Sequence, residues 1–478
     1  MTDPTLYESP LSSRYASREM SLLFSPQFKY STWRKLWVAL ASCQKTLGLP
    51  ITEDQIKAMK ACVNQIDFSQ VEIYEKKFRH DVMAHIHAFE DQCQEAKGII
   101  HLGATSCFVT DNGDLIQMQQ ALFILKNKLI LLMRHLYNFS KKHASLPCLS
   151  YTHFQPAQPT TVGKRACLWL QDFFFDFCEL EHLLNTFYFL GAKGATGTQA
   201  SFLSLFNGDH TKVRQLEKLL SKEMGFTFVI PISGQTYTRK QDSRILSVLA
   251  SFAASAHKFA TDFRLLAHLK EFEEPSTNTQ VGSSAMPHKH NPIRSERICG
   301  LARFLISLQA NPLYTHATQW LERSLDDSSN RRLTLPDAFL TADALCNLLC
   351  SLTSNIILYP KIIENNLNEE LPFLTTEPIL MEAVKRGKDR QLIHEKLRQH
   401  SQRASRQIKE EGTNPDLLNT IAQDSDIGLS IDTLQALSQP HHFLGRAVEQ
   451  TLEFLSGEVA PLLEKHKDLS YTAPDIRV

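Results

Sequence analysis

Apolar residues recur at helical spacing over three long stretches of the chain. In residues 122–139 the leucines alternate steps of three and four, which is the spacing of one buried helical seam. The same pattern occurs in 248–266 and, with many aromatic residues, in 162–187. None of these stretches contains a proline, so each predicts one long helix.

These helices carry more apolar surface than one small domain can cover. Residues 163–190 include three consecutive phenylalanines, Phe173 to Phe175, so more than one side of that helix needs a packing partner. We therefore predict an all-α fold with three helical domains around a central long-helix bundle that continues across subunits. The predicted domains are 1–106, 107–360 and the more charged 361–478. The alternative is one large monomeric helical domain.

Composition narrows the class of protein. The 478 residues include 51 Lys plus Arg and 51 Asp plus Glu, and a net charge of zero argues against nucleic acid or an anionic membrane as partner. The start of the chain has no signal-peptide pattern, and no stretch approaches the roughly 20 apolar residues of a membrane span. Ten cysteines form no CxxC pair, which favours reduced, buried thiols in a cytoplasmic protein.

Four polar or Gly/Pro-bearing stretches interrupt the helices, and such loops are where chemistry usually lies. They are RHDVMAHIHAFEDQCQEAKGIIHLGATS, LPCLSYTHFQPAQPTT, KGATGTQASF and EEPSTNTQVGSSAMPHKHNP. The last combines small residues, two hydroxyls and a lysine within 282–292, directly before a predicted helix start. An ordinary linker has no need of this combination, so we expect a functional loop here.

GSSAMPHKHNP resembles the GSSxMPxKxNP loop of the fumarase/aspartase superfamily, and the continuation RSER resembles its adenylosuccinate lyase branch. Similar segments extend from about residue 9 to beyond 380: SPLSSRYAS, RHDVMAH, IIHLGATS, THFQPAQPTTVGKR, KGATGTQASF, GQTYTRK, ERSLDDSSNRR and LPFLTTEPILM. One position departs from the family pattern, because His290 stands where arginine is common.

The resemblance implies β-elimination of fumarate from adenylosuccinate and from succinylaminoimidazole carboxamide ribotide, without a cofactor, in a homotetramer with shared active sites. It places the base at Ser283 and a cation that stabilises the carboxylate charge at Lys289. The general acid falls on His153, since imidazole titrates near working pH, and Glu296 is implied as the carboxylate that orients it. His80 resembles a histidine that contacts substrate near the reacting groups.

The resemblance also implies a set of substrate contacts. The phosphate is assigned to Arg14, Tyr15, Arg323, Ser328 and Arg332. Thr105, Ser106 and Gln235 are assigned to the succinyl group, and Arg297 to a neighbouring subunit's site. Arg79, Asp81, Thr152, Ser284 and Asn291 complete the expected substrate-binding set.

Other interpretations stay open at this point. His80 and His85 suggest a metal site, although they lie on different helical faces and lack a third ligand nearby. The same chemistry on argininosuccinate or a simple dicarboxylate is a second alternative, and a bundle that has lost activity is a third. Neither a P-loop nor a dinucleotide-binding fingerprint occurs.

Overall fold

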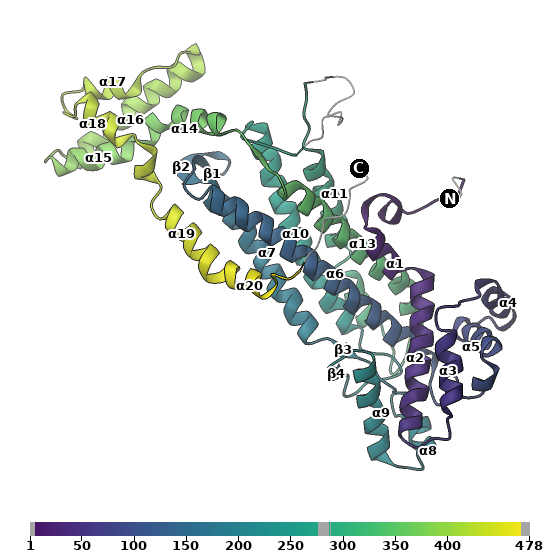
Figure 1. Cartoon of the computed structure of the whole chain (residues 1–478). Helices are drawn as coiled ribbons and strands as arrows, with labels where there is room; N and C mark the ends of the chain where they lie inside the picture. Colours follow the sequence, from purple (N-terminus) through teal and green to yellow (C-terminus); the bar gives the residue numbers. More distant parts are fainter. Residues whose placement is uncertain (1–4, 276–285, 287, 470–478) are drawn as a thin grey trace.

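The computed structural model describes residues 5–275, 286 and 288–469. Long helices run side by side along the molecule and make its central bundle (Figure 1). They are α6 (Ser106–Lys142), α7 (Val162–Asn185), α10 (Lys240–His268), α11 (Ile293–Ser307) and α13 (Asp326–Thr353). The prediction of an all-α fold around a long-helix bundle is confirmed, and the strands that occur are short.

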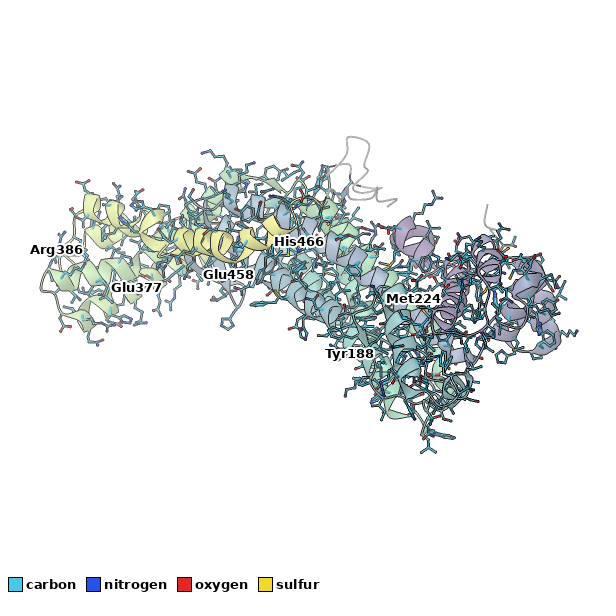
Figure 2. The ribbon with its side chains drawn as sticks, turned by 60° about the horizontal axis from the view of Figure 1, so that its bottom comes forward. Tyr188, Met224, Glu377, Arg386, Glu458 and His466 are labelled. Atoms are coloured by element: carbon cyan, nitrogen blue, oxygen red, sulfur yellow. The ribbon has the colours of Figure 1, made fainter. Side chains whose placement is uncertain are left out.

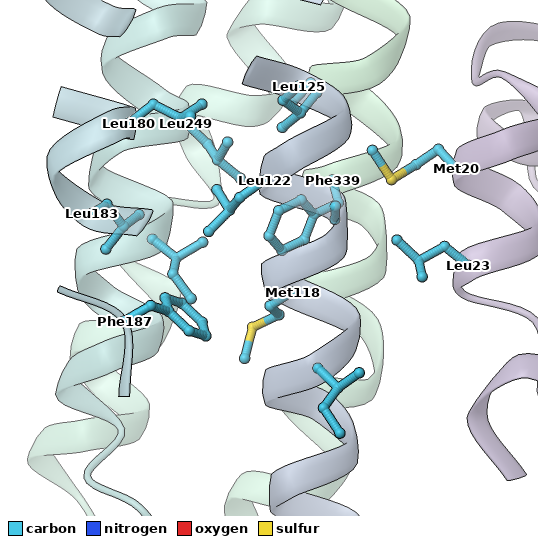
Figure 3. Close-up of a cluster of buried hydrophobic side chains, with 14 of the residues drawn as sticks. Met20, Leu23, Met118, Leu122, Leu125, Leu180, Leu183, Phe187, Leu249 and Phe339 are labelled. Carbon is cyan, nitrogen blue, oxygen red and sulfur yellow. The ribbon is translucent and has the colours of Figure 1, made fainter. Parts of the chain in front are cut away.

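The predicted apolar seams are the faces on which these helices pack. The seam residues Leu122, Leu125, Leu129, Leu132 and Leu136 are all buried in α6, and Phe139 at the end of the run is partly exposed. Figure 3 shows the seam of α6 between side chains of α7, α10 and α13 on one side and the start of the chain on the other. Its labelled residues are Met20, Leu23, Met118, Leu122, Leu125, Leu180, Leu183, Phe187, Leu249 and Phe339.

Shorter elements lie at one end of the bundle, near the start of α6 (Figure 1). They are α1 (Arg18–Leu23), α2 (Pro26–Thr46), α3 (Glu53–Ala61), α4 (Phe68–Phe78), α5 (Asp81–Gln92), α8 (Ala200–Leu205) and α9 (His210–Glu223). Strand β3 (Tyr188–Phe189) pairs in parallel with β4 (Phe228–Val229) at the same end.

The opposite end begins with a hairpin that follows α6 directly. Strand β1 (Pro147–Thr152) pairs antiparallel with β2 (Gln155–Thr161), and Thr161 then caps α7 by accepting the N–H of Lys164. Nearby lie β5 (Phe272–Glu273), β6 (Ile357–Leu358), α14 (Pro360–Leu374), α15 (Thr376–Lys385), α16 (Arg390–Arg406), α17 (Leu417–Ala422) and α18 (Ile431–Leu437). Helix α12 (Asn311–Ala317) packs instead on α10 and α13, where Thr315 accepts a hydrogen bond from Asn330 in the first turns of α13.

The C-terminal part contributes to three apolar clusters, one of which joins Leu367 and Leu371 to Leu149 of β1. Buried residues between 379 and 434 form a cluster of their own, whereas α19 (Ala447–Phe454) packs on α7 and is followed by α20 (Ala460–Lys465). Figure 2 shows Glu377 and Arg386 at one end of the molecule, with Glu458 and His466 placed between them and Met224. The domain boundaries at 106 and 360 stay a prediction.

A buried ion pair ties the start of the chain to the middle of the bundle. Lys128 of α6 pairs with Asp343 of α13, and both side chains are fully buried. The other carboxylate oxygen of Asp343 accepts the backbone N–H of Ser17 at 2.6 Å. Asn347 accepts from Lys128 at 2.8 Å, so every member of the cluster is hydrogen-bonded as buried polar groups must be.

Two expectations about burial are refined. Among the described helices α13 alone is long and apolar enough to span a membrane, yet 83% of its apolar window is buried inside the protein, so packing accounts for its composition.

Cys346 and Cys350 are buried in the same helix, as predicted. The expectation that all ten thiols are buried is wrong for Cys178, which is exposed on α7, and for Cys62, which is half-buried.

Candidate active site

A cavity of about 1000 Å³ opens where the first turns of α5, α6 and α13 meet. It brings together residues that lie far apart in the sequence and that were predicted to bind substrate. These are Arg79, His80, Asp81, Thr105, Ser106, Gln235, Arg323, Ser328 and Arg332. Helix N-termini converge here, and the positive ends of their dipoles favour an anionic ligand.

His80 lies at the N-terminus of α5, where it is the N-cap residue. Its Nδ1 accepts the backbone N–H of Met83 at 3.4 Å, so the neutral ring carries its proton on Nε2. That nitrogen lies 3.4 Å from the hydroxyl of Ser106, the first residue of α6. A substrate oxygen beside these two side chains could accept a hydrogen bond from Nε2 of His80 and from the hydroxyl of Ser106.

Arg239 forms the floor of the cavity. Its guanidinium donates to both carboxylate oxygens of Asp111, at 2.9 and 3.2 Å, and to Asp327 at 2.7 Å. Asp327 also accepts from Arg323 at 2.7 Å, which orients that cation toward the cavity that it lines. Burial alone would raise the pKa of Asp327, but the two guanidinium groups outweigh it and hold this pKa below its usual range.

A second buried cation, Arg331, joins the same helices beside this floor. It donates to Asp242 at 2.7 Å and to Asp114 at 3.0 Å, and it donates to the hydroxyl of Tyr237. Tyr237 in turn donates to Asp242 at 2.5 Å and is fully buried. A network in which each group is paired is rigid, so it fixes the segments that carry the lining residues.

Arg332, the next residue, stays at the surface of the cavity. Its side chain is 59% exposed and pairs with Asp81 at 3.1 Å. Pro336 lies one turn further in α13 and lacks the N–H that would bond the carbonyl of Arg332, which is the usual cause of a local bend. An exposed guanidinium with one carboxylate neighbour keeps donors for a bound anion.

The histidines at and near the start of α5 lie in different environments. His85 is buried with its ring stacked on Tyr30 at a centroid distance of 3.7 Å, and burial lowers its pKa to about 4. His80 faces the cavity instead. Over the residues that the structure describes, no three His, Cys, Asp or Glu side chains gather in a way that could hold a metal ion.

His153 and Thr152 lie away from the cavity, at the tip of the β1–β2 hairpin. His153 and Phe154 both have positive φ, 53° and 57°, which makes the tight turn. The hairpin follows the last residue of α6, whereas the cavity lies at its first turn. A helix of 37 residues is about 55 Å long, so one chain does not bring His153 to His80.

Other predicted residues also lie outside the cavity lining. Arg14 and Tyr15 end a short π-helix, Leu11–Tyr15, where Arg14 is exposed and Tyr15 packs against the core. Lys289, just before α11, and Glu296, in its first turn, are exposed, whereas Asn291 and Arg297 nearby in sequence are half-buried. Ser283 and Ser284 lie outside the described residues.

A smaller cavity of about 270 Å³ lies beside that segment and is lined by His288, His290, Asn291 and Tyr359, among others. His290 points its Nδ1 at Glu273, 3.5 Å away, so the position where arginine is common in the resembling family still faces a carboxylate here. Glu274 caps α11 by accepting the N–H groups of Arg294 and Ser295 at 2.9 and 2.7 Å.

The residues that the sequence analysis did not identify are mainly the buried supports. Arg239 lies within the segment GQTYTRK, and Arg331 precedes the predicted Arg332. Asp111 and Asp114 are one helical turn apart at the start of a long apolar helix. Two carboxylates on such a helix indicate buried ionic groups that need cationic partners. Their partners are more than a hundred residues away along the chain, so the pairing itself is not readable locally.

Comparison with known proteins gives full-length matches. A family model described as "Lyase" matches residues 26–305, and one described as "Adenylosuccinate lyase C-terminus" matches 372–454. Adenylosuccinate lyases of Saccharomyces cerevisiae and Schizosaccharomyces pombe are each 48% identical, over 97% and 98% of both chains. That of Pyrococcus abyssi is 31% identical over 92% of this chain and 95% of its own.

Solved structures agree on the fold. A fumarate lyase from Mesorhizobium sp. BNC1 superposes with a TM-score of 0.80 at 22% identity, covering 95% of this chain and all of its own. A 3-carboxy-cis,cis-muconate lactonizing enzyme from Pseudomonas putida gives 0.82 at 23% identity, covering 93% and 98%. At these identities the likeness concerns the architecture alone.

Proposed function

Because the chain belongs to the adenylosuccinate lyase family, we propose that it eliminates fumarate from adenylosuccinate, giving AMP, and from succinylaminoimidazole carboxamide ribotide, giving the carboxamide ribotide. Relatives of that name match it over 97% to 98% of both chains.

One observation carries the proposal: the large cavity combines exposed and buried arginines with hydroxyl and amide groups from three helices. The substrate carries two carboxylates and a phosphate, roughly four negative charges. Arg323 and Arg332 suit the phosphate because a guanidinium binds it with two charge-assisted hydrogen bonds. Ser106 and Gln235 suit the succinyl carboxylates as neutral donors.

The proposed reaction breaks a C–N bond by acid and base catalysis. Ser283, as alkoxide, removes the proton from the carbon beside one carboxylate, and the electron pair is held on that carboxylate as an aci-carboxylate near Lys289. The pair then forms the C=C bond of fumarate as the C–N bond breaks. His153, oriented by Glu296, gives the leaving nitrogen its proton. These steps need side-chain groups only, and we assign no metal or cofactor to them.

We further propose that each site is assembled from several subunits of a homotetramer. The support is the length of α6, which separates the cavity from the His153 hairpin within one chain. Exposed apolar side chains on the bundle, such as Leu168 and Phe175 of α7, would be covered in such an assembly. The many buried free thiols agree with a location in the reducing cytoplasm.

The test is to incubate the purified chain with adenylosuccinate and measure AMP and fumarate by chromatography. We expect the two products in equal amounts, and the same with the imidazole substrate. Turnover of argininosuccinate or a plain dicarboxylate in place of the nucleotides would assign a different substrate. Absence of turnover with all of them would indicate a bundle that has lost activity.

A further inference from the structure

The side chain of Gln235 is held at both of its polar ends where it lines the cavity. Its Nε2 donates to the carbonyl of Ala195 at 3.0 Å, and its Oε1 accepts from the thiol of Cys107 at 3.3 Å. Its backbone N–H donates to the carbonyl of Glu322, also at 3.0 Å. A glutamine amide has two N–H groups and two lone pairs, so one of each remains for a ligand.

These contacts fix which end of the amide is which. Exchanging oxygen and nitrogen would place Oε1 against the carbonyl oxygen of Ala195, where two acceptors repel. The thiol of Cys107 secures the other end, because an S–H group donates to the oxygen. The free N–H and lone pair therefore have a defined arrangement before any ligand binds.

The segment that supplies the Ala195 carbonyl is itself closely packed against the Gln235 segment. Gly197 has φ of 81°, and a Cβ there would lie 1.9 Å from the carbonyl oxygen of Ser233. A Cβ on Gly234 would lie 2.5 Å from the carbonyl oxygen of Glu322. Backbones this close leave no room for the loop to shift, so the loop KGATGTQ acts as a rigid support for the amide.

Burial keeps the side chain of Cys107 in place and keeps its thiol protonated, so that it can donate to Gln235. It is the second residue of α6 and only 4% exposed. A helix N-terminus commonly lowers the pKa of a thiol, but burial dominates here and raises the pKa of Cys107 to about 12. The sulfur therefore keeps its proton at neutral pH and is no nucleophile.

We infer that Cys107 is a positioning residue, which orients the carboxamide of Gln235 so that its free N–H meets a carboxylate of the substrate. The inference rests on the proposed function for the identity of that carboxylate. Ser106, the preceding residue, lines the same cavity, so the first turn of α6 would serve the substrate both directly and through Gln235. Because Ser106 and Cys107 are consecutive residues of α6, the position of this helix fixes both of them relative to the cavity.

The experiment compares Cys107→Ala with Cys107→Ser in steady-state cleavage of adenylosuccinate. Losing one hydrogen bond that holds the amide should raise KM about three- to tenfold. The serine variant should restore KM to within about twofold, because its hydroxyl also donates. Cys350→Ala is the matched control: that buried thiol donates to the carbonyl of Lys128 in the middle of the bundle, so its loss should leave KM unchanged.

A double-mutant cycle with Gln235→Ala separates positioning from packing. If Cys107 acts through the amide, Cys107→Ala should have no further effect on KM once the amide is gone. Equal effects of Cys107→Ala in the presence and absence of Gln235 would overturn the inference, as would a KM unchanged from wild type.

Crystal structures of the wild type and of Cys107→Ala test the geometry without turnover. We expect the side chain of Gln235 to lose its fixed orientation in the variant, and an unchanged orientation would overturn the inference. A wild-type protein that cleaves no succinyl nucleotide would refute the proposed function alone, because this structural comparison would still decide the role of Cys107.

Discussion

A mixing experiment tests whether one site draws His80 and His153 from different subunits. The perturbation is a pair of variants, His80→Gln and His153→Gln, each made as a homo-oligomer. Loss of the proposed acid His153 should lower the rate by about 100- to 10,000-fold, whereas loss of His80 removes a contact to the substrate near its reacting groups. Both parents should therefore be nearly inactive, for unrelated chemical reasons.

The structure sets the size of the recovery. The cavity and the hairpin lie at opposite ends of α6, about 55 Å apart by the 1.5 Å rise of its 37 residues. Residues 143–153 could reach back at most about 36 Å even if fully extended, which is less than the length of α6, so His153 does not reach His80 of its own chain. With equal mixing, half of the cavities keep His80 and half of the hairpins keep His153, so about a quarter of the sites regain both in a symmetric assembly.

The assay mixes the two variants after gentle dissociation, reassembles them, and confirms hybrids by native mass spectrometry. Cleavage of adenylosuccinate is then compared with wild type and with each parent carried through the same treatment. We expect activity near a quarter of wild type. Hybrids of confirmed composition that stay as inactive as the parents would refute the shared site, because a site built from one chain always keeps one lesion.

Arg332→Ala should raise KM for both nucleotides about tenfold or more, since a charge-assisted phosphate contact is lost, and an unchanged KM would contradict the phosphate assignment. Arg239→Met should lower the free energy of unfolding by about 3–5 kcal/mol in urea titrations, because it leaves the buried carboxylate of Asp111 without its cation; a change under about 1 kcal/mol would count against this. Burial raises the pKa of Asp176 from 3.8 to about 6, so its charged form destabilises the fold above pH 6. Asp176→Asn should thus raise stability at pH 8 by up to about 3 kcal/mol, a gain that disappears near pH 4; equal gains at both pH values would refute it. Ser283→Ala should bind substrate without turnover, as measured by calorimetry and product formation, and near-normal elimination would remove it from the base role.

The fold was largely predictable because apolar residues recur at helical spacing within the sequence of each main helix. The seam from Leu122 to Leu136 and the run from Val162 to Phe187 have unbroken periodicity, and the corresponding helices are α6 and α7. The β1–β2 hairpin was not predicted as strands. Its sequence includes Pro156 and Pro159, which indicate a loop, and its pairing follows from the tight turn at His153 and Phe154.

The candidate site was predictable only as far as side chains lie in recognisable motifs. His80, Ser106 and Gln235 were expected near one another and do line one cavity. The supports beneath them were not, because the pairing of Arg239 with Asp111 joins residues 128 positions apart and depends on how α10 packs against α6. The proposed contribution of His153 would require neighbouring chains, which a single sequence does not describe.

The contact between Ser17 and Asp343 has a consequence for how the chain folds during synthesis. It joins residues 326 positions apart by a direct hydrogen bond, and the same carboxylate pairs with Lys128, so both contacts form only when α13 is present. At about 5–20 residues per second, a ribosome needs roughly 15–65 seconds to make the intervening chain. Until then Met20 and Leu23, which end in the core, lack their packing surface on α13. Helix α1 can therefore complete its packing only after α13 has been made, whereas its contacts with α2 and α6 are available much earlier.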